Sequence, residues 1–448
     1  MDRRGCVARP QAGRTCETAT MDLVSLSSPV ATPRAAAVAR SSGWILARET
    51  WRFFLAIVAT SLLGKALSEQ AFGFITLVAS IYAFGQVAMD HGLGTIVTRD
   101  VSRDPSLERP LLAQAMGYRV GAGVVVGLAV LAYAVVRKTG AEQAWLIGVA
   151  ATFPLLAPSI LGVVFLVRQD LGPVSAISSF TQLLFLVIAW VGLAVGIPPA
   201  SFACLHMVRE TLGPWMLGAW ASLRHGIGPA CAWPAAQLRG TLSATSSQAV
   251  TTLAITASTH IGVILVESLA APGALGAYGA AFRLTNPFSL LVASMSQPLL
   301  PALASAWHKD RPKFDLLIRR ALGLGLLAGI GGVLVTSLCG RLVVEWLYGG
   351  KYLAPGGDAA SVMAYAGVAF GAICVGAPAT TALVAIGREK SLMYLVLFAL
   401  LANIGVAWWL IPSVGPRGAA MGLMVAELLT AVVACVTLLS AMKEREDT

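Results

Sequence analysis

Residues 72–100 read FGFITLVASIYAFGQVAMDHGLGTIVTRD. The stretch carries no charge before Asp90, and His91 and two glycines follow before the charged exit at Arg99. A helix needs about 20 mostly apolar residues to cross a bilayer. The stretch therefore predicts a membrane-spanning helix that ends near Asp90. This acid is either a functional group or marks the hydrated end of the helix.

Similar apolar runs fill most of the chain. Of its 448 residues, 57% are hydrophobic and 12% are charged, about half of the charged share of a soluble domain. The runs lack the ten-residue alternation of an outer-membrane barrel, so the sequence predicts an all-α, polytopic membrane protein. Charged residues, Pro and Gly divide the chain into about 12 runs, which start near Trp44, Phe72, Leu111, Glu142, Leu171, Pro198, Gly240, Gly273, Lys313, Asp358, Lys390 and Pro416.

Lysines and arginines are distributed unevenly between the two sides of these predicted helices. If the N-terminus is cytoplasmic, 15 of them fall in inner segments beyond the N-terminal tail, against 6 in outer loops. Cytoplasmic loops of membrane proteins carry such an excess. The sequence therefore predicts a multi-pass protein of the cell membrane with both termini cytoplasmic. The same distribution indicates that the net charge of +10 serves orientation in the membrane and not the binding of a nucleic acid.

The runs also define the predicted domain organisation. Five segments are expected: a disordered cytoplasmic tail (1–43), a six-helix bundle (44–223), a cytoplasmic linker (224–239), a second six-helix bundle (240–442) and a cytoplasmic tail (443–448). The first tail has no signal-peptide pattern, and Met21 is an alternative start. The seven cysteines show no CxxC or Cys/His spacing, so no metal, disulfide or cofactor is expected.

The two halves of the chain resemble each other. LSEQAFGFI (67–75) is similar to LAAPGALGAY (269–278), FLVRQD (165–170) to VAIGREK (384–390), and MVRETL (207–212) to MVAELL (424–429). The pairs keep their order and are offset by six predicted spans, an even number that preserves orientation. We therefore expect two pseudo-symmetric six-helix bundles around a central cavity, with Gly73 equivalent to Gly276 and Glu210 to Glu427.

The segment GKALSEQAFGFITLVASIYAFGQVAMDHGLGTIVTRDVSR (64–103) resembles the second-helix region of bacterial polysaccharide flippases. These belong to the multidrug/oligosaccharidyl-lipid/polysaccharide exporter superfamily. The shared pattern is an apolar helix that closes on Asp-x-Gly-x-Gly and a basic turn, here Asp90, Gly92, Gly94 and Arg99.

Other parts of the chain extend this resemblance. GALGAYGAAFRLTNPFSLLVASMSQPLLPALASAW (273–307) is similar to the eighth helix of the family, and residues 345–365 and 380–429 resemble its last three spans. The chain departs from the family at THIGVILVE (259–267), where His260 and Glu267 stand in place of an acid within the seventh helix.

The resemblance implies a transporter and not an enzyme. It implies that the chain flips a polyprenyl-diphosphate-linked oligosaccharide from the cytoplasmic to the outer leaflet by alternating access, with the bilayer and other polysaccharide assembly proteins as partners. The alternative is a multidrug or organic-cation exporter of the same superfamily, which should favour acidic cavity residues. A glycan polymerase or ligase is less favoured, because the longest predicted outer connection, Arg341 to Asp358, is short and no Walker or nucleophile-elbow motif occurs.

Charged residues within or beside the spans are the candidates for substrate binding. Arginine offers a planar fork of donors to phosphate oxygens, so a cationic cavity suits a diphosphate. The candidates are Arg283, Arg119, Asp90, Arg209, Arg48 and Arg52. For each arginine the alternative is a structural ion pair or an anchor at the membrane interface. For Asp90 it is a helix end that pairs with Arg99 or Arg103.

Four further residues are candidates for ion or proton coupling, because titratable groups inside a bilayer are costly and usually functional. They are Glu210, His206, Glu427 and Glu267. His206 and Glu210 are four residues apart and share a helix face. This spacing predicts either a proton relay or a structural hydrogen bond between them.

Overall fold

The computed structural model describes residues 51, 54–168, 170–232, 246–285, 299–300, 302–307, 309–353 and 358–444. Over these ranges the chain is helical, without a strand. After a helix at Phe54–Ala66, the α-helices are α2 (Glu69–Asp90), α3 (Leu93–Arg103), α4 (Glu108–Arg137), α5 (Gly140–Thr152), α6 (Gly162–Val167), α7 (Leu171–Val195), α8 (Ala203–His225), α10 (Ser246–Leu269), α11 (Ala274–Thr285), α13 (Arg311–Tyr348), α14 (Ala359–Ala385), α15 (Glu389–Val414) and α16 (Pro416–Glu444). Four 3-10 segments join them: η1 (Pro105–Leu107), η2 (Phe153–Leu161), η3 (Pro199–Phe202) and η4 (Gly350–Leu353).

Nine helical stretches in the described ranges are long and apolar enough to cross a membrane. The prediction of an all-α, multi-pass membrane protein is therefore confirmed. The count of twelve spans stays a prediction. The helix at Phe54–Ala66 is shorter than the others, and the runs predicted near Gly240 and Gly273 extend beyond the described residues.

The fourth predicted run is not a continuous α-helix. After α5 the chain tightens into η2 and then continues as α6. Pro154 and Pro158 lie in η2, and a proline has no N–H to donate to the preceding turn, which favours a local departure from α-helix. Glycines let η2 approach α4 closely: a Cβ on Gly123 would lie 2.9 Å from the Cα of Pro154. This contact places Ser159 of η2 beside α4.

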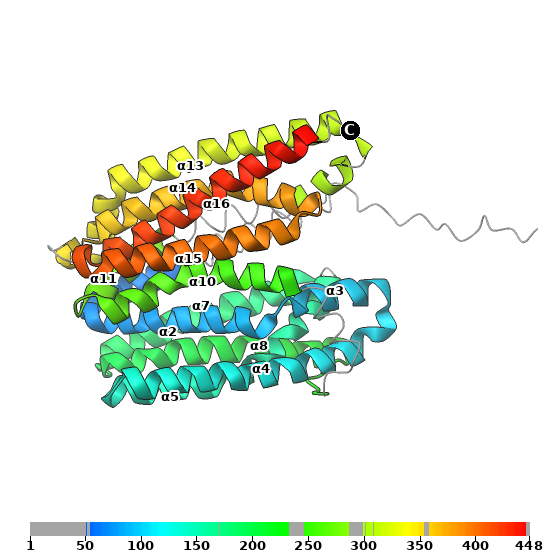
Figure 1. The fold of residues 1–448 in the computed structure, drawn as a ribbon. Coiled ribbons are helices and arrows are strands. Elements are labelled where there is room, and N and C mark those ends of the chain that lie inside the picture. Colours follow the sequence, from blue (N-terminus) through cyan, green and yellow to red (C-terminus); the bar gives the residue numbers. More distant parts are fainter. Residues whose placement is uncertain are drawn as a thin grey trace, which may run out of the picture. The chain divides into compact units, whose positions relative to one another are not determined.

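The helices lie side by side (Figure 1), and most of their contacts fall within one or the other half of the chain. In the second half, α14 packs against α13 and α16, and α15 packs against α16 and α10. In the first half, η2 packs against α4 and α8, and α7 packs against α8. Helix α2 contacts α10 and α11 of the second half as well as α4. The boundary between the halves therefore runs along α2.

Glycines bring α2 and α11 into backbone contact at this boundary. A Cβ on Gly73 would lie 3.0 Å from the backbone nitrogen of Gly276, and one on Gly276 would lie 2.3 Å from the carbonyl oxygen of Glu69. One turn further, a Cβ on Gly279 would lie 2.4 Å from Oγ1 of Thr76. The two glycines that the sequence repeat pairs are thus neighbours in space. The two-bundle repeat itself stays a prediction.

Polar contacts join the halves near the start of α2. Lys351 Nζ donates to the carbonyl oxygen of Leu67 at 2.5 Å, and the Tyr352 hydroxyl donates to the carbonyl oxygen of Gly64 at 3.1 Å. By the distribution of Lys and Arg, this end of the helices is the predicted outer end. The first half and the segment after α13 are therefore tied together on that side.

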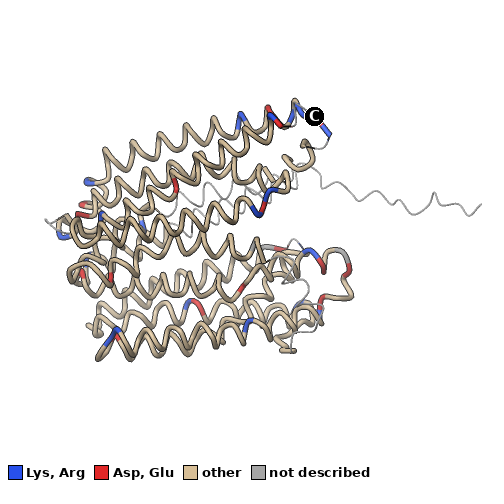
Figure 2. Tube along the Cα trace, viewed as in Figure 1, with Lys and Arg blue, Asp and Glu red and all other residues tan. Residues whose placement is uncertain are grey.

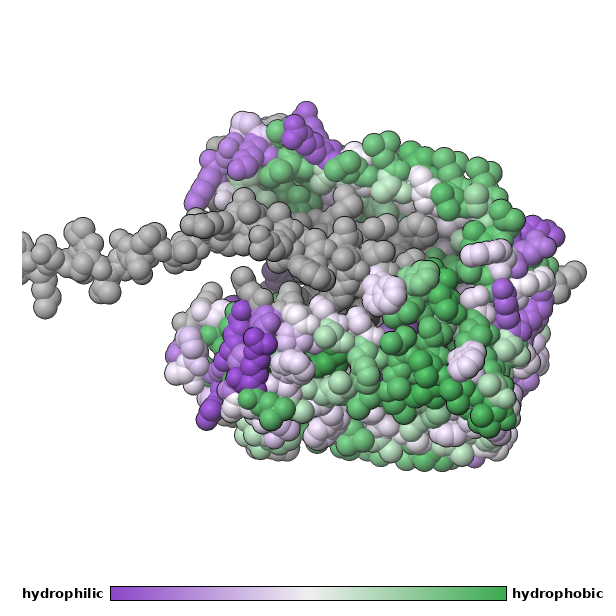
Figure 3. All heavy atoms as spheres, turned by 180° about the vertical axis from the view of Figure 1, so that it is seen from behind, coloured by the Kyte–Doolittle hydropathy of each residue, from purple (hydrophilic) through white to green (hydrophobic). Residues whose placement is uncertain are grey.

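Charge and hydropathy are arranged as a bilayer requires. Charged residues gather near the two ends of the helices and are sparse between them (Figure 2). Large apolar side chains are exposed along the helices, including Leu327, Leu338 and Trp409. One face shows a broad apolar surface between hydrophilic groups at its ends (Figure 3). Apolar exposure of this extent suits contact with lipid and not with water.

Candidate functional site

A polar pocket of about 260 Å³ lies within the first half, among α2, η2, α7 and α8. Its polar lining is Gln86, Ser159, Ser178, Thr181, Gln182, Arg209 and Glu210. Amide and hydroxyl groups both donate and accept hydrogen bonds. The pocket is therefore chemically suited to a ligand rich in hydroxyl groups.

Glu210 accepts hydrogen bonds from two helices in this pocket. Gln86 Nε2 of α2 donates to one carboxylate oxygen at 2.6 Å, and Arg209 Nε donates to the other at 2.8 Å. The Arg209 guanidinium also lies 5.5 Å from the centre of the Phe185 ring. Arg209 and Glu210 thus compensate each other's charge, which lowers the cost of holding both at membrane depth.

His206 does not bond to Glu210, although the two share a helix face. Its side chain is buried, and neither ring nitrogen has a hydrogen-bond partner among the described residues. The imidazole instead packs edge-on against Phe185 at 5.1 Å between ring centres. The alternative of a structural hydrogen bond between His206 and Glu210 is therefore not formed in this structure, where Arg209 and Gln86 donate to the Glu210 carboxylate. A coupling role for the two residues stays a prediction.

Asp90 and Arg119, two substrate-binding candidates, pair with each other. Arg119 Nη1 lies 2.5 Å from Asp90 Oδ1, and Nη2 donates to Ser159 Oγ at 2.8 Å. The Arg119 side chain is 6% exposed and that of Asp90 is 37% exposed. The alternative is a helix-end pair of Asp90 with Arg99 or Arg103; Arg99 pairs with Asp100 instead, and the side chain of Arg103 lies outside the described residues. Asp90 is therefore the counter-ion of a buried arginine from α4.

The backbone after Asp90 turns sharply to begin the next helix. His91 and Gly92 adopt left-handed conformations, with φ of 45° and 76°. Glycine takes this conformation at little cost, whereas His91 is the one non-glycine residue with positive φ in the described ranges. The turn ends α2 and leaves the Asp90 carboxylate directed at α4.

Arg283 of α11 is partly buried and forms no ion pair with a carboxylate of the described residues. Its guanidinium lies 4.9 Å from the centre of the Phe72 ring of α2. Nη2 is inaccessible to solvent and has no hydrogen-bond partner in the part of the chain that the structure describes. Arg283 is also close enough to Arg209 for the two positive charges to repel each other. The boundary between the halves therefore holds a net positive charge next to the polar pocket.

Aromatic rings enclose Phe72 beside this arginine. Tyr348 and Tyr352 contact the Phe72 ring at 5.9 and 5.8 Å between ring centres, and each other at 5.6 Å. Tyr348 lies in α13 and Tyr352 in η4, whereas Phe72 belongs to α2. Aromatic rings from both halves thus form one cluster that Arg283 contacts through Phe72.

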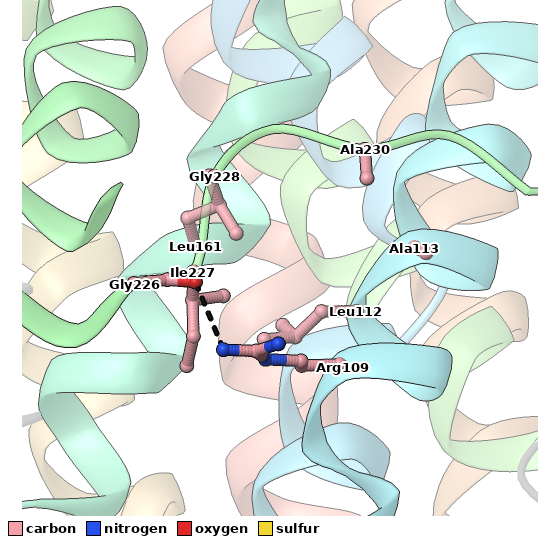
Figure 4. A pocket seen from close by; sticks show the side chains of 8 residues that line it. All are labelled: Arg109, Leu112, Ala113, Leu161, Gly226, Ile227, Gly228 and Ala230. Carbon is pink, nitrogen blue, oxygen red and sulfur yellow. Dashed lines mark hydrogen bonds between the residues drawn. The ribbon is translucent and has the colours of Figure 1, made fainter.

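A smaller pocket of about 200 Å³ lies at the opposite end of the first half (Figure 4). The chain after α8 covers the start of α4 there: Arg109 Nη2 donates to the carbonyl oxygen of Gly226 at 3.2 Å, and Ala232 N to that of Ala113 at 2.9 Å. The remaining lining is mainly apolar. This pocket is therefore a gap left where the chain after α8 packs against α4, and it lacks the polar lining of a second polar site.

Comparison with known proteins identifies the family. A family described as "Polysaccharide biosynthesis protein" matches residues 62–355, well over half of the chain. The chain belongs to the polysaccharide biosynthesis protein family. This confirms the resemblance seen in the sequence. Among curated proteins, no sequence matches this member of the family.

Solved structures show the fold of this family member. An inward-facing MATE multidrug transporter of the MOP superfamily is 12% identical, with a TM-score of 0.73 over 88% of this chain and 96% of that one. The lipid II flippase MurJ, in an inward closed conformation, is 12% identical, with a TM-score of 0.69 over 87% and 86%. A MOP superfamily transporter from Pyrococcus furiosus is 12% identical, with a TM-score of 0.59 over 90% and 96%. The polysaccharide biosynthesis protein described here therefore has the MOP transporter fold.

Glu267, a coupling candidate, belongs to an ion-pair cluster in this polysaccharide biosynthesis protein. Lys138 Nζ lies 2.6 Å from Glu267 Oε1 and 2.9 Å from Glu142 Oε2, and the Tyr133 hydroxyl donates to Glu267 at 2.5 Å. The cluster joins α4 and α5 of the first half to the end of α10. The structure therefore places Glu267 in a contact between the halves and away from the polar pocket.

The remaining candidates differ in their surroundings. Glu427 lies on the buried face of α16, between Leu423 and Ala431, and makes no ion pair or hydrogen bond with another residue of the described ranges. Its coupling role stays a prediction. Arg48 and Arg52 lie outside the described residues.

Sequence reasoning missed the uncharged residues of the pocket in this family member. Gln86 lies four residues before Asp90 and so shares its helix face, a signal that was available. Gln182 is a lone amide in the apolar run of α7. Ser159 carries no such signal, because its place beside Arg119 depends on the 3-10 path of η2.

Proposed function

We propose that this chain flips a polyprenyl-diphosphate-linked oligosaccharide from the cytoplasmic to the outer leaflet of the cell membrane by alternating access, in cell-surface polysaccharide biosynthesis. Its partners would be other polysaccharide assembly proteins, and both termini would be cytoplasmic. The observation that carries the proposal is Arg283, a partly buried cation whose inaccessible Nη2 has no hydrogen-bond partner and which has no carboxylate partner in the described residues.

The electrostatics favour an anionic substrate group. An uncompensated charge inside a bilayer costs about 2.5–3.5 kcal/mol on insertion scales. Arg209 and Arg119 are compensated by Glu210 and Asp90, whereas the Phe72 ring offers Arg283 only a cation–π contact. A diphosphate would supply the missing negative charge and accept hydrogen bonds from the free guanidinium nitrogen.

The pocket beside Arg283 suits the saccharide. Gln86, Ser178, Thr181 and Gln182 present amides and hydroxyls from two helices, and such groups recognise sugar hydroxyls by paired donation and acceptance. We infer that the glycan rests in this pocket while the polyprenyl chain stays in the lipid. The membership in a polysaccharide biosynthesis family supports the same substrate class.

The alternative is export of organic cations. Such a substrate needs an uncompensated acid in the cavity, but Glu210 and Asp90 both already hold arginines. Glu427 is the carboxylate that this alternative would use, since it has no partner among the described residues. For the Pyrococcus furiosus transporter, reversed polarity of the binding pocket suggests a different function, so pocket charge is the property to test.

The test is flipping of a fluorescent short-chain polyprenyl-diphosphate oligosaccharide in proteoliposomes. Arg283→Ala should abolish flipping, and Arg283→Lys should restore only part of it because an ammonium replaces a bidentate fork. Arg224→Ala is the control, since Arg224 is an exposed residue at the end of α8 that pairs with Asp170. Normal flipping by a well-inserted Arg283→Ala protein would refute the proposal. Cation export that is lost in Glu427→Gln would favour the alternative.

A further inference from the structure

An apolar groove of about 570 Å³ runs along the second half, among α13, α14 and α16. Every residue that lines it is aliphatic, glycine or cysteine. Ile330 and Val432 on its two walls are 50% and 59% exposed. The groove is therefore open to the lipid along its length, and it shares no residue with the polar pocket of the first half.

The groove exists because two helices meet through glycine. A Cβ on Gly329 of α13 would lie 2.8 Å from the carbonyl oxygen of Gly371 of α14. A Cβ on Gly325 would lie 2.2 Å from the carbonyl oxygen of Cys374. The floor of the groove is thus backbone, while side chains such as Ile330 rise on either side.

A basic rim lies at one end of the groove. Arg319 precedes Leu326 of the groove by seven residues, two helical turns, so both occupy the same face of α13. Arg319 is exposed and forms no ion pair within the described ranges. Gly323 lies between them, and a Cβ there would meet nothing within 4 Å. Lys443, at the end of α16, is exposed on the same side of the membrane.

The rim and the groove together have the depth of one leaflet. Arg319 and Leu334 are fifteen residues apart, which is about 22 Å at 1.5 Å per residue. A bilayer with its headgroup regions is about 40–45 Å thick, so one leaflet takes about 20–22 Å. A ligand that fills both parts would therefore carry its negative charge and one apolar chain within a single leaflet.

We propose that this groove binds one acyl chain of an anionic phospholipid, with the phosphate held by Arg319. Membrane helices bind anionic headgroups through such basic sites beside apolar surface. A polyprenyl phosphate has the same two chemical parts, but its longer chain would extend beyond a groove of this depth. The basic end is the predicted cytoplasmic end, so the lipid belongs to the inner leaflet.

The test is native mass spectrometry of the full chain in detergent, with phosphatidylglycerol or phosphatidylethanolamine added. We expect the first phosphatidylglycerol to bind about tenfold more tightly than phosphatidylethanolamine, as one charge-assisted contact would give. Arg319→Gln should remove this preference. Val432→Trp should fill the groove and weaken binding of both lipids. Lys313→Gln and Leu342→Trp are matched controls on the exposed surface of α13.

The outcomes separate the possibilities. Equal binding of the two lipids by the unmodified chain would overturn the proposal, as would adducts that persist in both Arg319→Gln and Val432→Trp. Loss of binding in the two controls would show non-specific adsorption and would overturn it as well. Displacement of phosphatidylglycerol by a polyprenyl phosphate at lower concentration would assign the groove to that lipid instead. Arg319→Gln changes an exposed side chain, so it keeps the test open if the tryptophan variant does not fold.

Discussion

At the scale of single residues, the pair of Asp90 and Arg119 shows how charge is accommodated inside the first half. Arg119 is almost wholly buried and holds Asp90 and Ser159 with two of its nitrogens. The removal of one member of such a pair leaves an uncompensated charge, which costs more than the pair itself contributes.

We expect Asp90→Ala to lower the free energy of unfolding by about 2 kcal/mol. This is below the roughly 3–5 kcal/mol of a fully buried pair, because the Asp90 side chain is about one-third exposed. The double variant Asp90→Ala/Arg119→Met should recover most of the loss, since it leaves no charge behind. The measurement is thermal unfolding of the purified protein in detergent. Equal loss in the single and double variants would contradict this account.

The sequence predicts which residues are buried and charged but not their partners. Asp90 and Arg119 were both identifiable as charges inside spans, yet they are 29 residues apart and meet only through the packing of α2 on α4. His206 and Glu210 show the reverse. Their spacing is correct for contact, but Gln86 and Arg209 compete successfully for the carboxylate.

At the scale of helices, the cluster around Lys138 joins the halves at the predicted outer end. Burial opposes the charge of Lys138, but its hydrogen bonds to Glu267 and Glu142 outweigh this and raise its pKa above the usual value. A raised pKa means that the stabilisation is complete below the pKa of the unfolded chain, about 10.4, and is lost only as the pH rises through the folded value. The ion pair therefore holds throughout the range of pH 6–9.

We expect Glu267→Gln to raise the exposure of the outer end, because α10 loses its charged contact with α4. The measurement is the rate at which a cysteine introduced at buried Leu67, just before α2, reacts with a membrane-impermeant maleimide, which should rise several-fold. Lys138→Glu combined with Glu267→Lys should restore the slow rate. Glu345→Gln, at an exposed position of α13, serves as the control. An unchanged rate in Glu267→Gln would show that the pair does not hold this end closed.

The helices themselves were largely predictable, and their irregularities were not. Apolar runs located the spans because a bilayer admits only long apolar helices. The prolines of the fourth run indicated a weak point, but not that nine residues would follow a 3-10 path. That path depends on Gly123 of α4, which allows η2 to approach, and on Gly127, which allows Ala150 of α5 to approach just before it. No local pattern encodes these contacts.

At the scale of the whole molecule, the distribution of Lys and Arg predicts the orientation in the membrane. The 15-to-6 excess on one side predicts that both termini lie in the cytoplasm. A reporter that fluoresces only in the cytoplasm should be active when fused after Thr448, and an alkaline phosphatase fused there should be inactive. The opposite pair of results would contradict the predicted topology. A phosphatase fusion in the loop after Tyr348 should be active and is the matched control.

The backbone contact between Gly73 and Gly276 has a mechanical consequence. Interdigitated side chains must separate before two helices can change their crossing angle. Two backbones in direct contact present no such obstacle. The contact lies near one end of α2, so the rest of the helix acts as a lever of about 26 Å from Gly73 to Asp90. A tilt of α2 by only about 10° at this pivot would carry the far end through roughly 4–5 Å, so a small change of angle at one face of the membrane would give a larger displacement at the other.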